Sequence, residues 1–224
     1  MAGRTIAIGD IHGCAAAFDA LLAAIAPQEG DLLIALGDYI DRGPDSRGVL
    51  DRLLELEQRC KLVSLLGNHE VMLLQALANE RAEALWRECG GEETLASYGG
   101  QITGIPREHL KFLTRCQRYY ETDTHFFVHA NYDHRLPLDE QTDELLLWTH
   151  LLYRMPKPHV SGKIAVVGHT PQAACRVLEL PYLIGLDTCC YGDGCLTALN
   201  LESGERWQAT AAGELLPAVE GTGS

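Results

Sequence analysis

The sequence has 224 residues, of which 46% are hydrophobic and 22% are charged. This mixture is that of an ordinary globular domain, and it excludes disordered, collagen-like and fibrous proteins. The 18 lysines and arginines are outnumbered by 31 aspartates and glutamates, so the formal net charge is −13. Because nonspecific nucleic-acid binding depends on clustered cations, and no run of Lys or Arg occurs, we expect no nucleic-acid partner.

The N-terminal stretch and the cysteines both favour a cytoplasmic protein. Residues 1–9 lack the charged-then-apolar pattern of a secretion signal, and the longest apolar run, residues 20–26, is far too short to span a membrane. We therefore expect no membrane partner. The eight cysteines show no framework spacing, which favours free thiols over disulfides. Cys189, Cys190 and Cys195 fit either a soft-metal or redox cluster or small buried strand residues, and we favour the second interpretation.

Short apolar runs that stop abruptly at polar residues recur along the chain, which is typical of buried strands bounded by turns. Five of them are residues 5–8, 32–36, 62–66, 126–128 and 164–167. Helical patterns lie between them and predict helices around residues 18–25, 49–56, 71–86, 92–98 and 107–113. The first three strand ends are about 30 residues apart, the length that one βαβ crossover needs.

The second half of the chain is richer in strands. Further strands are predicted at residues 117–121, 175–180, 182–186, 196–201 and 206–211. Residues 156–162 form a loop on composition, and we interpret it as an insertion rather than a linker because a strand resumes at once. We therefore expect a single domain over residues 1–216 and a flexible tail over residues 217–224.

The five strand ends carry side chains of one chemical type, mainly hard oxygen donors and imidazoles. The set is Asp10, His12, Asp38, Asp41, Arg42, Asn68, His69, His129 and His169. Open α/β sheets bind ligands at the carboxyl ends of their strands, so these side chains are expected to converge. Such donors suit one or two divalent ions of the Mn, Fe, Zn or Co kind.

Each motif alone has an ordinary explanation. An Asp-x-His pair is common by chance, and Gly-Asn-His-Glu at residues 67–70 also fits a turn followed by a helix cap. Five strand ends with the same ligand chemistry are much harder to attribute to core packing. The joint occurrence therefore predicts a metal site.

The motifs also resemble a known family. Gly-Asp-Ile-His-Gly (9–13), Gly-Asp-Tyr-Ile-Asp-Arg-Gly (37–43), Gly-Asn-His-Glu (67–70), His-Ala (129–130) and Gly-His-Thr-Pro (168–171) resemble the phosphoprotein phosphatase (PPP) family, within the calcineurin-like metallophosphoesterases. The likeness runs from residue 5 to about residue 200, and the length is similar to that of the compact bacterial and phage serine/threonine phosphatases. It implies an α/β sandwich of two central mixed β-sheets flanked by helices, with the metals at one rim.

The resemblance also implies a site with two divalent ions, with Mn²⁺ favoured and Fe, Zn or Co as alternatives. Asp10 and His12 would hold the first ion and Asp38 would bridge both. The second ion would be completed by Asn68, His129 and His169. Such a pair of ions would let a bridging hydroxide form near neutral pH and attack the phosphorus.

Three further residues take catalytic roles by the same resemblance. Arg42 would clamp two phosphoryl oxygens, although a structural ion pair is the alternative. His69 would protonate the leaving oxygen, and Asp41 would orient that imidazole and keep it protonated. The role of Glu70 stays open, because an acid is also favourable in the first turn of a helix.

The sequence departs from the family pattern at three places. Asn131 stands where the family usually has Gly or Asp, and Cys189 stands where its Asp-Thr-Gly ends in glycine. A second phosphate-binding arginine is expected between the last two histidine motifs, where the candidates are Arg135 and Arg154. Arg154 is the weak favourite of the two, although an ordinary surface arginine is the favoured interpretation.

Three functions compete at this point. The first is hydrolysis of phosphoserine or phosphothreonine in proteins, which the compact length and the Gly-His-Thr-Pro context favour. The second is hydrolysis of dinucleoside polyphosphates such as diadenosine tetraphosphate, which would use the same residues. The third is a non-catalytic phosphate-binding module, which needs neither His69 nor Asp41. The substrate would be a phosphoprotein or a small phosphate ester, and the sequence leaves the oligomeric state open.

Overall fold

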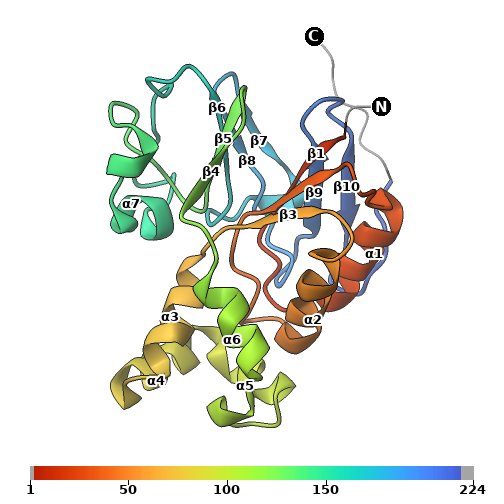
Figure 1. Cartoon of the computed structure of the whole chain (residues 1–224), viewed down its shortest axis with the longest axis vertical. Helices are drawn as coiled ribbons and strands as arrows, with labels where there is room; N and C mark the ends of the chain where they lie inside the picture. The colour runs from red at the N-terminus through yellow and green to blue at the C-terminus, as the bar shows by residue number, and fades with distance from the viewer. Residues whose placement is uncertain (1–2, 218–224) are drawn as a thin grey trace.

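Two five-stranded mixed sheets form the centre of the computed structural model, which describes residues 3–217 (Figure 1). The first sheet has the strand order β10-β9-β1-β2-β3 and the second has the order β4-β5-β6-β8-β7. The strands are β1 (Thr5–Ile8), β2 (Leu32–Ala35), β3 (Lys61–Ser64), β4 (Tyr119–Glu121), β5 (His125–Val128), β6 (Ile164–Val167), β7 (Leu178–Leu180), β8 (Leu183–Gly185), β9 (Leu196–Asn200) and β10 (Arg206–Ala209).

Successive side chains of a strand point to opposite faces of its sheet, so each sheet packs against helices on one face and against the other sheet on the opposite face. In β1, Ile6 and Ile8 pack toward the outer helices, while Ala7 packs into the core between the two sheets. In β5, Phe127 joins that same central core, while Phe126 packs on the outer face of the second sheet. The predicted α/β fold with two mixed sheets and flanking helices is confirmed.

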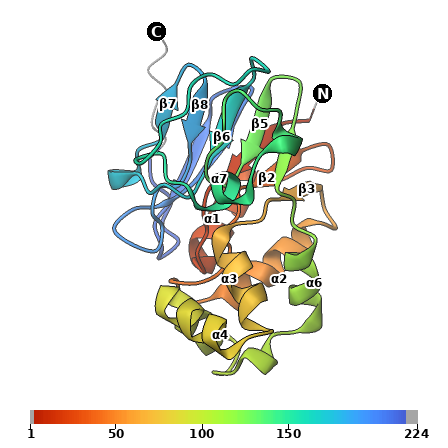
Figure 2. The same ribbon diagram turned by 90° about the vertical axis from the view of Figure 1, so that its left-hand side faces the viewer.

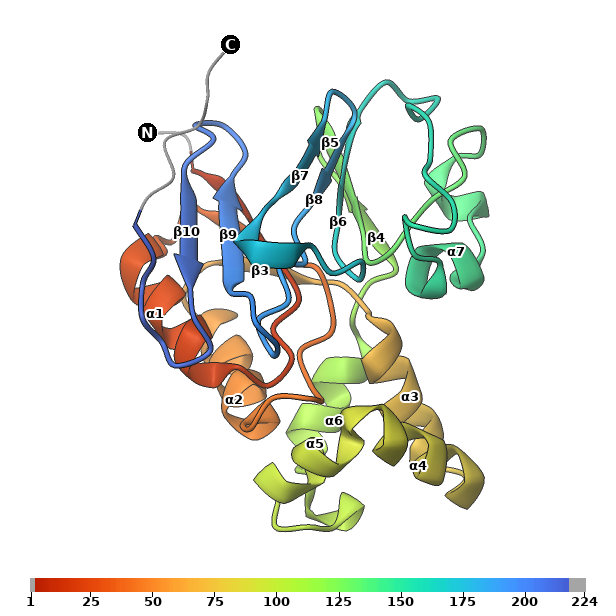
Figure 3. The same cartoon turned by 180° about the vertical axis from the view of Figure 1, so that it is seen from behind.

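Seven α-helices surround the sheets in the described residues. They are α1 (Ala15–Ile25), α2 (Ser46–Leu56), α3 (Asn68–Ala76), α4 (Glu80–Trp86), α5 (Glu92–Ser97), α6 (Arg107–Thr114) and α7 (Asp143–Trp148). Helices α3, α4 and α6 gather at one end of the sheets (Figure 2), and α1 lies against β9 and β10, as the view from behind shows (Figure 3). No helix among the described residues is long and apolar enough to span a membrane.

The structure departs from the predicted elements at helix and strand ends. The predicted helix 71–86 is two helices, because Asn79 interrupts it and its side chain caps α4 by accepting hydrogen bonds from the Arg81 and Ala82 amides. Helix α7 was not predicted. The strand predicted from Cys175 begins at Leu178, after a turn that contains two residues with positive φ. The predicted tail 217–224 lies outside the described residues except for Pro217.

The expectation that all eight cysteines are free was wrong for one pair. Cys175 and Cys195 are joined as a disulfide, with Cα atoms 5.4 Å apart. Cys175 lies in the turn before β7 of the second sheet, and Cys195 directly precedes β9 of the first. The bridge therefore links the two sheets, a proximity that arises only when the sandwich forms. The other six cysteines are free, and Cys189 and Cys190 lie in a loop rather than on a strand.

Candidate metal centre

The polar motifs meet where β1, β2, β3, β5 and β6 end, because β1, β2 and β3 are parallel neighbours and so are β5 and β6. Their backbones are bent sharply at this edge. The residues other than glycine with φ between 45° and 72° in these motifs are His12, Asp38, Asp41, Arg42 and His169. Left-handed φ is costly for residues with a side chain, and such strain gathers at functional sites. The two packed sheets, whose strands lead into these turns, hold the turns in place.

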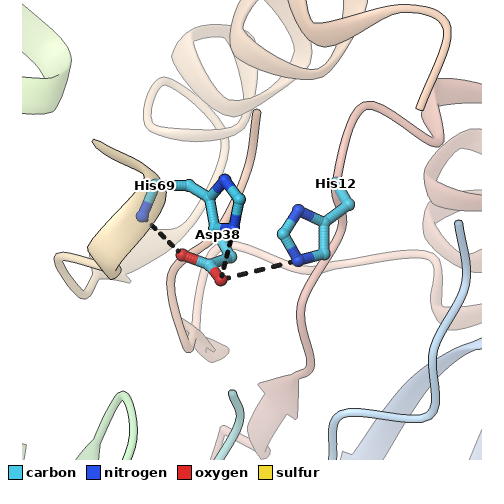
Figure 4. Close-up of side chains that lie close together, drawn as sticks. All are labelled: His12, Asp38 and His69. Carbon is cyan, nitrogen blue, oxygen red and sulfur yellow. Dashed lines mark hydrogen bonds and ion pairs between the residues drawn. The ribbon is translucent and has the colours of Figure 1, made fainter. Parts of the chain in front are cut away.

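Asp38 lies at the centre of the cluster (Figure 4). Its Oδ2 is 3.5 Å from His12 Nε2 and 4.0 Å from His69 Nε2, and its Oδ1 is 3.4 Å from His129 Nε2. Two groups of buried ligand atoms share this carboxylate: His12, Asp38 and His69 form one, and Asp38, His129 and His169 form the other. The surrounding imidazoles lower the pKa of Asp38 although burial alone would raise it, so it carries its negative charge.

Backbone carbonyls orient two of these imidazoles. The Ile40 oxygen lies 2.9 Å from His12 Nδ1, and the Leu36 oxygen lies 2.8 Å from His129 Nδ1. Each carbonyl can only accept, so Nδ1 donates and the Nε2 lone pair faces Asp38, as in metal-binding histidines. Burial lowers the pKa of His12 to about 3 and also lowers that of His129. Both rings are therefore neutral and able to act as ligands at neutral pH.

The hydrogen-bond partners of Asp10 and His169 indicate whether the site suits a cation. Asp10 Oδ2 accepts a hydrogen bond of 2.8 Å from the His169 amide, whereas Asp10 Oδ1 and His169 Nε2 are buried with no partner among the described residues. Burial, reinforced by Asp187 and Asp38, raises the pKa of Asp10 well above its usual value. Buried unpaired donors and acceptors are costly, and divalent cations at the cluster would satisfy these two atoms. The donor set therefore fits the expected ions.

Gly168 allows the loop after β6 to lie close to Asp10. A Cβ at this position would lie 2.0 Å from Asp10 Oδ1, so any side chain would displace the carboxylate. The Gly-His-Thr-Pro motif therefore needs glycine at this position, because only a residue without a side chain lets the loop after β6 lie directly on the loop after β1.

Helix α3 supplies the third strand-end motif at its N-terminus. Asn68 and His69 are its first two residues, and the His69 amide donates to Asp38 Oδ1 at 3.1 Å. Asn68 Oδ1 lies 3.1 Å from His129 Nε2, so this amide oxygen belongs to the same group of ligand atoms. The positive end of the helix dipole stabilises the negative charge of the Asp38 carboxylate that faces it.

Glu70, whose role the sequence left open, holds the loop that carries Asp38. Its buried carboxylate accepts hydrogen bonds from three backbone amides, those of Gly67, Asp38 and Tyr39, at 2.8–2.9 Å. Burial and the Asp38 charge raise its pKa to about 8. Glu70 touches the backbone around the cluster and therefore positions Asp38.

We expect Glu70→Gln to lower the free energy of unfolding of the metal-free protein by about 1–3 kcal/mol, because one amide N–H would then face a donor instead of an acceptor. Urea unfolding of the variant measures this change, and Glu93→Gln on exposed α5 is the control. Unchanged stability of Glu70→Gln would show that these amides find other partners.

His69 is paired with a carboxylate that is itself fully satisfied. Asp41 Oδ2 lies 2.7 Å from His69 Nδ1 and accepts from Trp86 Nε1 at 2.8 Å, while Oδ1 accepts from the Thr94 hydroxyl at 2.7 Å. The negative charges of Asp38 and Asp41 raise the pKa of His69 even though burial opposes this. The imidazole is thus fixed in orientation and favoured in its protonated form.

Arg42 projects from the same strained turn as Asp41. Its amide donates to the Gly90 oxygen at 3.0 Å, and its Nη1 lies 3.2 Å from His12 Nε2. The guanidinium carbon stands 4.5 Å from the centre of the Tyr191 ring, a cation–π contact. Arg42 is exposed, so its free donors face the cluster from the solvent side.

The two candidates for a second arginine both form ion pairs. Arg135 and Arg154 both pair with Asp133, at 2.8 and 2.9 Å. Asn131, one of the departures, donates its Nδ2 to the Arg154 carbonyl. Cys189 adopts φ 59°, so the left-handed conformation that the family's glycine suggests is kept here by a residue with a side chain.

Sequence reasoning missed several neighbours of the cluster. Trp86 and Thr94 come from regions whose pattern predicted helices and nothing more, and Tyr191 comes from an irregular loop. The ring centre of His150 is 4.3 Å from that of His169. Nothing in the local sequence marks these residues, since only the packing of distant segments brings them to the site.

Comparisons with known proteins agree with this geometry. The family model for calcineurin-like phosphoesterases matches residues 3–198. Serine/threonine-protein phosphatase 1 of Salmonella typhimurium is 30% identical over 210 residues, which cover 87% of this chain and 90% of that protein. The symmetrical bis(5'-nucleosyl)-tetraphosphatase of Acidovorax sp. is 45% identical, but over 33% of this chain and 26% of that protein.

Solved structures give the same fold. A crystal structure provisionally described as a diadenosine tetraphosphatase is 26% identical, with a TM-score of 0.69 over 99% of this chain and 96% of that one. A cold-active protein-tyrosine phosphatase of a Shewanella species has a TM-score of 0.67 at 15% identity, over 98% of this chain and 81% of that one. From the matched family model and the buried His/Asp cluster, we conclude that the chain belongs to the calcineurin-like phosphoesterase family.

Proposed function

We propose that this metal-dependent phosphoesterase is a PPP-type enzyme that removes phosphate from phosphoserine or phosphothreonine in proteins. The observation that carries the proposal is the placement of Arg42 and the His69–Asp41 pair around the carboxylate of Asp38, which both groups of ligand atoms share. The likeness to a serine/threonine phosphatase along nearly the whole of both chains supports this substrate class.

Six residues would hold two divalent ions, for which we propose Mn²⁺. Asp10 and His12 would serve one ion, Asn68, His129 and His169 the other, and Asp38 both. The proximity of His69 to His12 and Asp38 is consistent with a role at the leaving group beside the first ion. When bound, such ions neutralise phosphoryl oxygens and make water acidic enough to act as a nucleophile near neutral pH.

Arg42, His69 and Asp41 carry out the substrate binding and proton transfer that the reaction also requires. Arg42 binds two phosphoryl oxygens through its planar fork and orients the phosphorus for in-line attack. The seryl oxygen departs as its bond to phosphorus breaks, and His69 donates the proton that this oxygen needs. Asp41 accepts from His69 Nδ1 throughout, so Nε2 is the nitrogen that gives up its proton.

A dinucleoside polyphosphate hydrolase is the second candidate, favoured by the likeness to the structure described as a diadenosine tetraphosphatase. A polyphosphate chain spreads several negative charges over its length and needs several cations to bind it. Around the cluster Arg42 is exposed, whereas Arg135 and Arg154 are paired with Asp133. One exposed arginine beside the cluster suits the binding of a single phosphoryl group better than the binding of a polyphosphate chain.

A substrate panel tests the two functions. Manganese-loaded protein is assayed with phosphoserine peptides, diadenosine tetraphosphate and p-nitrophenyl phosphate at equal metal and salt. We expect the highest kcat/KM on a phosphoserine peptide. A kcat/KM that is higher on the dinucleotide than on every peptide would replace the first function with the second.

Tyr191 provides a separate test of the role of Arg42. If its ring holds the guanidinium in place, Tyr191→Leu should raise the inhibition constant of inorganic phosphate about 3- to 10-fold, whereas Tyr191→Phe should leave it close to the parent value. Both variants are also measured in an Arg42→Ala background. There the Leu substitution should have no further effect, and an undiminished effect would mean that Tyr191 acts on phosphate without Arg42.

A further inference from the structure

Large apolar side chains are exposed in one region beside the metal centre. We call the side chains of Trp148, Leu152, Tyr153 and Met155 the apolar ledge; 41%, 81%, 86% and 50% of their respective surfaces are exposed. The ledge begins at Trp148, the last residue of α7, and this helix packs on the outer face of the second sheet (Figure 2). Isolated exposed hydrophobic residues are ordinary, but four within eight positions of the chain mark an interaction surface.

The ledge is built on a fixed backbone. The Leu151 amide donates to the buried Thr170 hydroxyl at 3.0 Å, and Asn131 Nδ2 donates to the Arg154 carbonyl at 2.8 Å. The Tyr132 hydroxyl donates to the Lys157 carbonyl at 3.0 Å. These contacts anchor the segment from both sides, so the apolar side chains are presented to solvent by an ordered turn. Such preorganisation lowers the entropic cost of binding a partner.

The ledge is continuous with the metal centre. The ring of His150 is 4.3 Å from that of His169 and 5.7 Å from that of Tyr153. His169 in turn stands 5.0 Å from His129, so a row of rings leads from the buried cluster to the solvent. Tyr153 of the ledge is therefore connected to the cluster through His150 and His169.

The local charge also suits a phosphorylated partner. The chain carries 31 acidic residues, yet none lies between Leu145 and Leu178. Within that stretch the ledge is accompanied by Arg154, Lys157 and His150. Asp133 lies 2.9 Å from Arg154 and offsets its charge, so Lys157 and the lack of acids within this stretch are what favour an anionic segment with an apolar side chain over the rest of this acidic protein.

We propose that the apolar ledge binds an apolar side chain close to the phosphoserine of a protein substrate, and so determines which phosphorylation sites are hydrolysed. This proposal rests on the proposed function. Leu152 and Met155 offer no hydrogen-bond donor and only a weak thioether acceptor, so they match an aliphatic or aromatic side chain better than the polar edge of a nucleobase. A nucleobase and a second copy of this chain are the alternative occupants.

The experiment compares two phosphoserine peptides with the manganese-loaded full chain. One peptide has leucine residues on both sides of the phosphoserine, the other has serines, and p-nitrophenyl phosphate reports the chemistry alone. The parent should prefer the leucine peptide about tenfold in kcat/KM, and Leu152→Gln with Met155→Gln should abolish the preference. Leu85→Gln changes a leucine of α4 that is 57% exposed and lies outside the ledge, and it should keep the preference.

Each contrary outcome has its own meaning. Hydrolysis of both peptides with no preference overturns the ledge and leaves the proposed function standing. Hydrolysis of p-nitrophenyl phosphate with neither peptide cleaved overturns both. An equal loss of kcat/KM on all three substrates in the double variant shows that Leu152 and Met155 have a structural role instead of a role in selecting peptides. Diadenosine tetraphosphate is assayed in parallel, and a loss of activity confined to it in the double variant identifies a nucleobase as the occupant. A dimer in sedimentation that the double variant dissociates identifies a second copy. Either result overturns the ledge proposal.

Discussion

Asp38→Asn is expected to abolish the tight binding of at least one of the two divalent ions and to lower kcat/KM about 10³-fold, at the upper end of what loss of one preorganised charge-stabilising group costs (~10²–10³). Asp38 is the carboxylate that both groups of ligand atoms share, so its charge acts on both ions at once. Asparagine keeps the size of the side chain and tolerates the positive φ of 50° at this position, so the turn itself should survive.

Metal content measured by mass spectrometry, beside the kinetics, checks this expectation. Asp31→Asn is the matched control, because Asp31 is also a buried carboxylate but pairs with Arg4 at the opposite end of β2. It should lower stability and leave the metal content at about two ions per chain. Full metal occupancy and near-parental activity in Asp38→Asn would contradict the bridging role.

The strand-end motifs made much of this architecture predictable. Parallel strands bring their carboxyl ends to one edge of a sheet, so Asp10 and Asp38 in the first sheet, and His129 and His169 in the second, could each be expected to lie near one another. The spacing of the apolar runs indicated βαβ crossovers, and the family resemblance implied the two-sheet sandwich. The elements that differ, such as the helix break at Asn79, depend on single capping residues that a periodic pattern does not reveal.

What the sequence could not predict comes from tertiary packing. Trp86 and Thr94 reach Asp41 because α4 and α5 fold back over the turn after β2, and their own sequences carry only helical patterns. The Cys175–Cys195 bridge joins the two sheets, which no spacing rule predicts. His150 lies on His169 because the segment after α7 is anchored to the loops around it. In each case the partner is supplied by a distant segment.

His69→Asn is expected to slow hydrolysis of a phosphoserine peptide by about 10²–10⁴-fold, the usual contribution of general acid catalysis. The loss on p-nitrophenyl phosphate should be markedly smaller. A seryl alkoxide is a poor leaving group and needs the proton, whereas p-nitrophenolate is stabilised by its ring. Asp41→Asn should show the same pattern more weakly, because Asp41 only orients and charges the imidazole.

Arg42→Ala distinguishes this role from simple binding. It removes a phosphate contact that both esters share, so both rates should fall together. The comparison requires that metal content stay at the parental level in all three variants, since His69 Nε2 is only 4.0 Å from Asp38 Oδ2. With both ions retained, equal losses of His69→Asn on the two esters would mean that His69 positions neighbouring groups and that another group supplies the proton to the leaving oxygen.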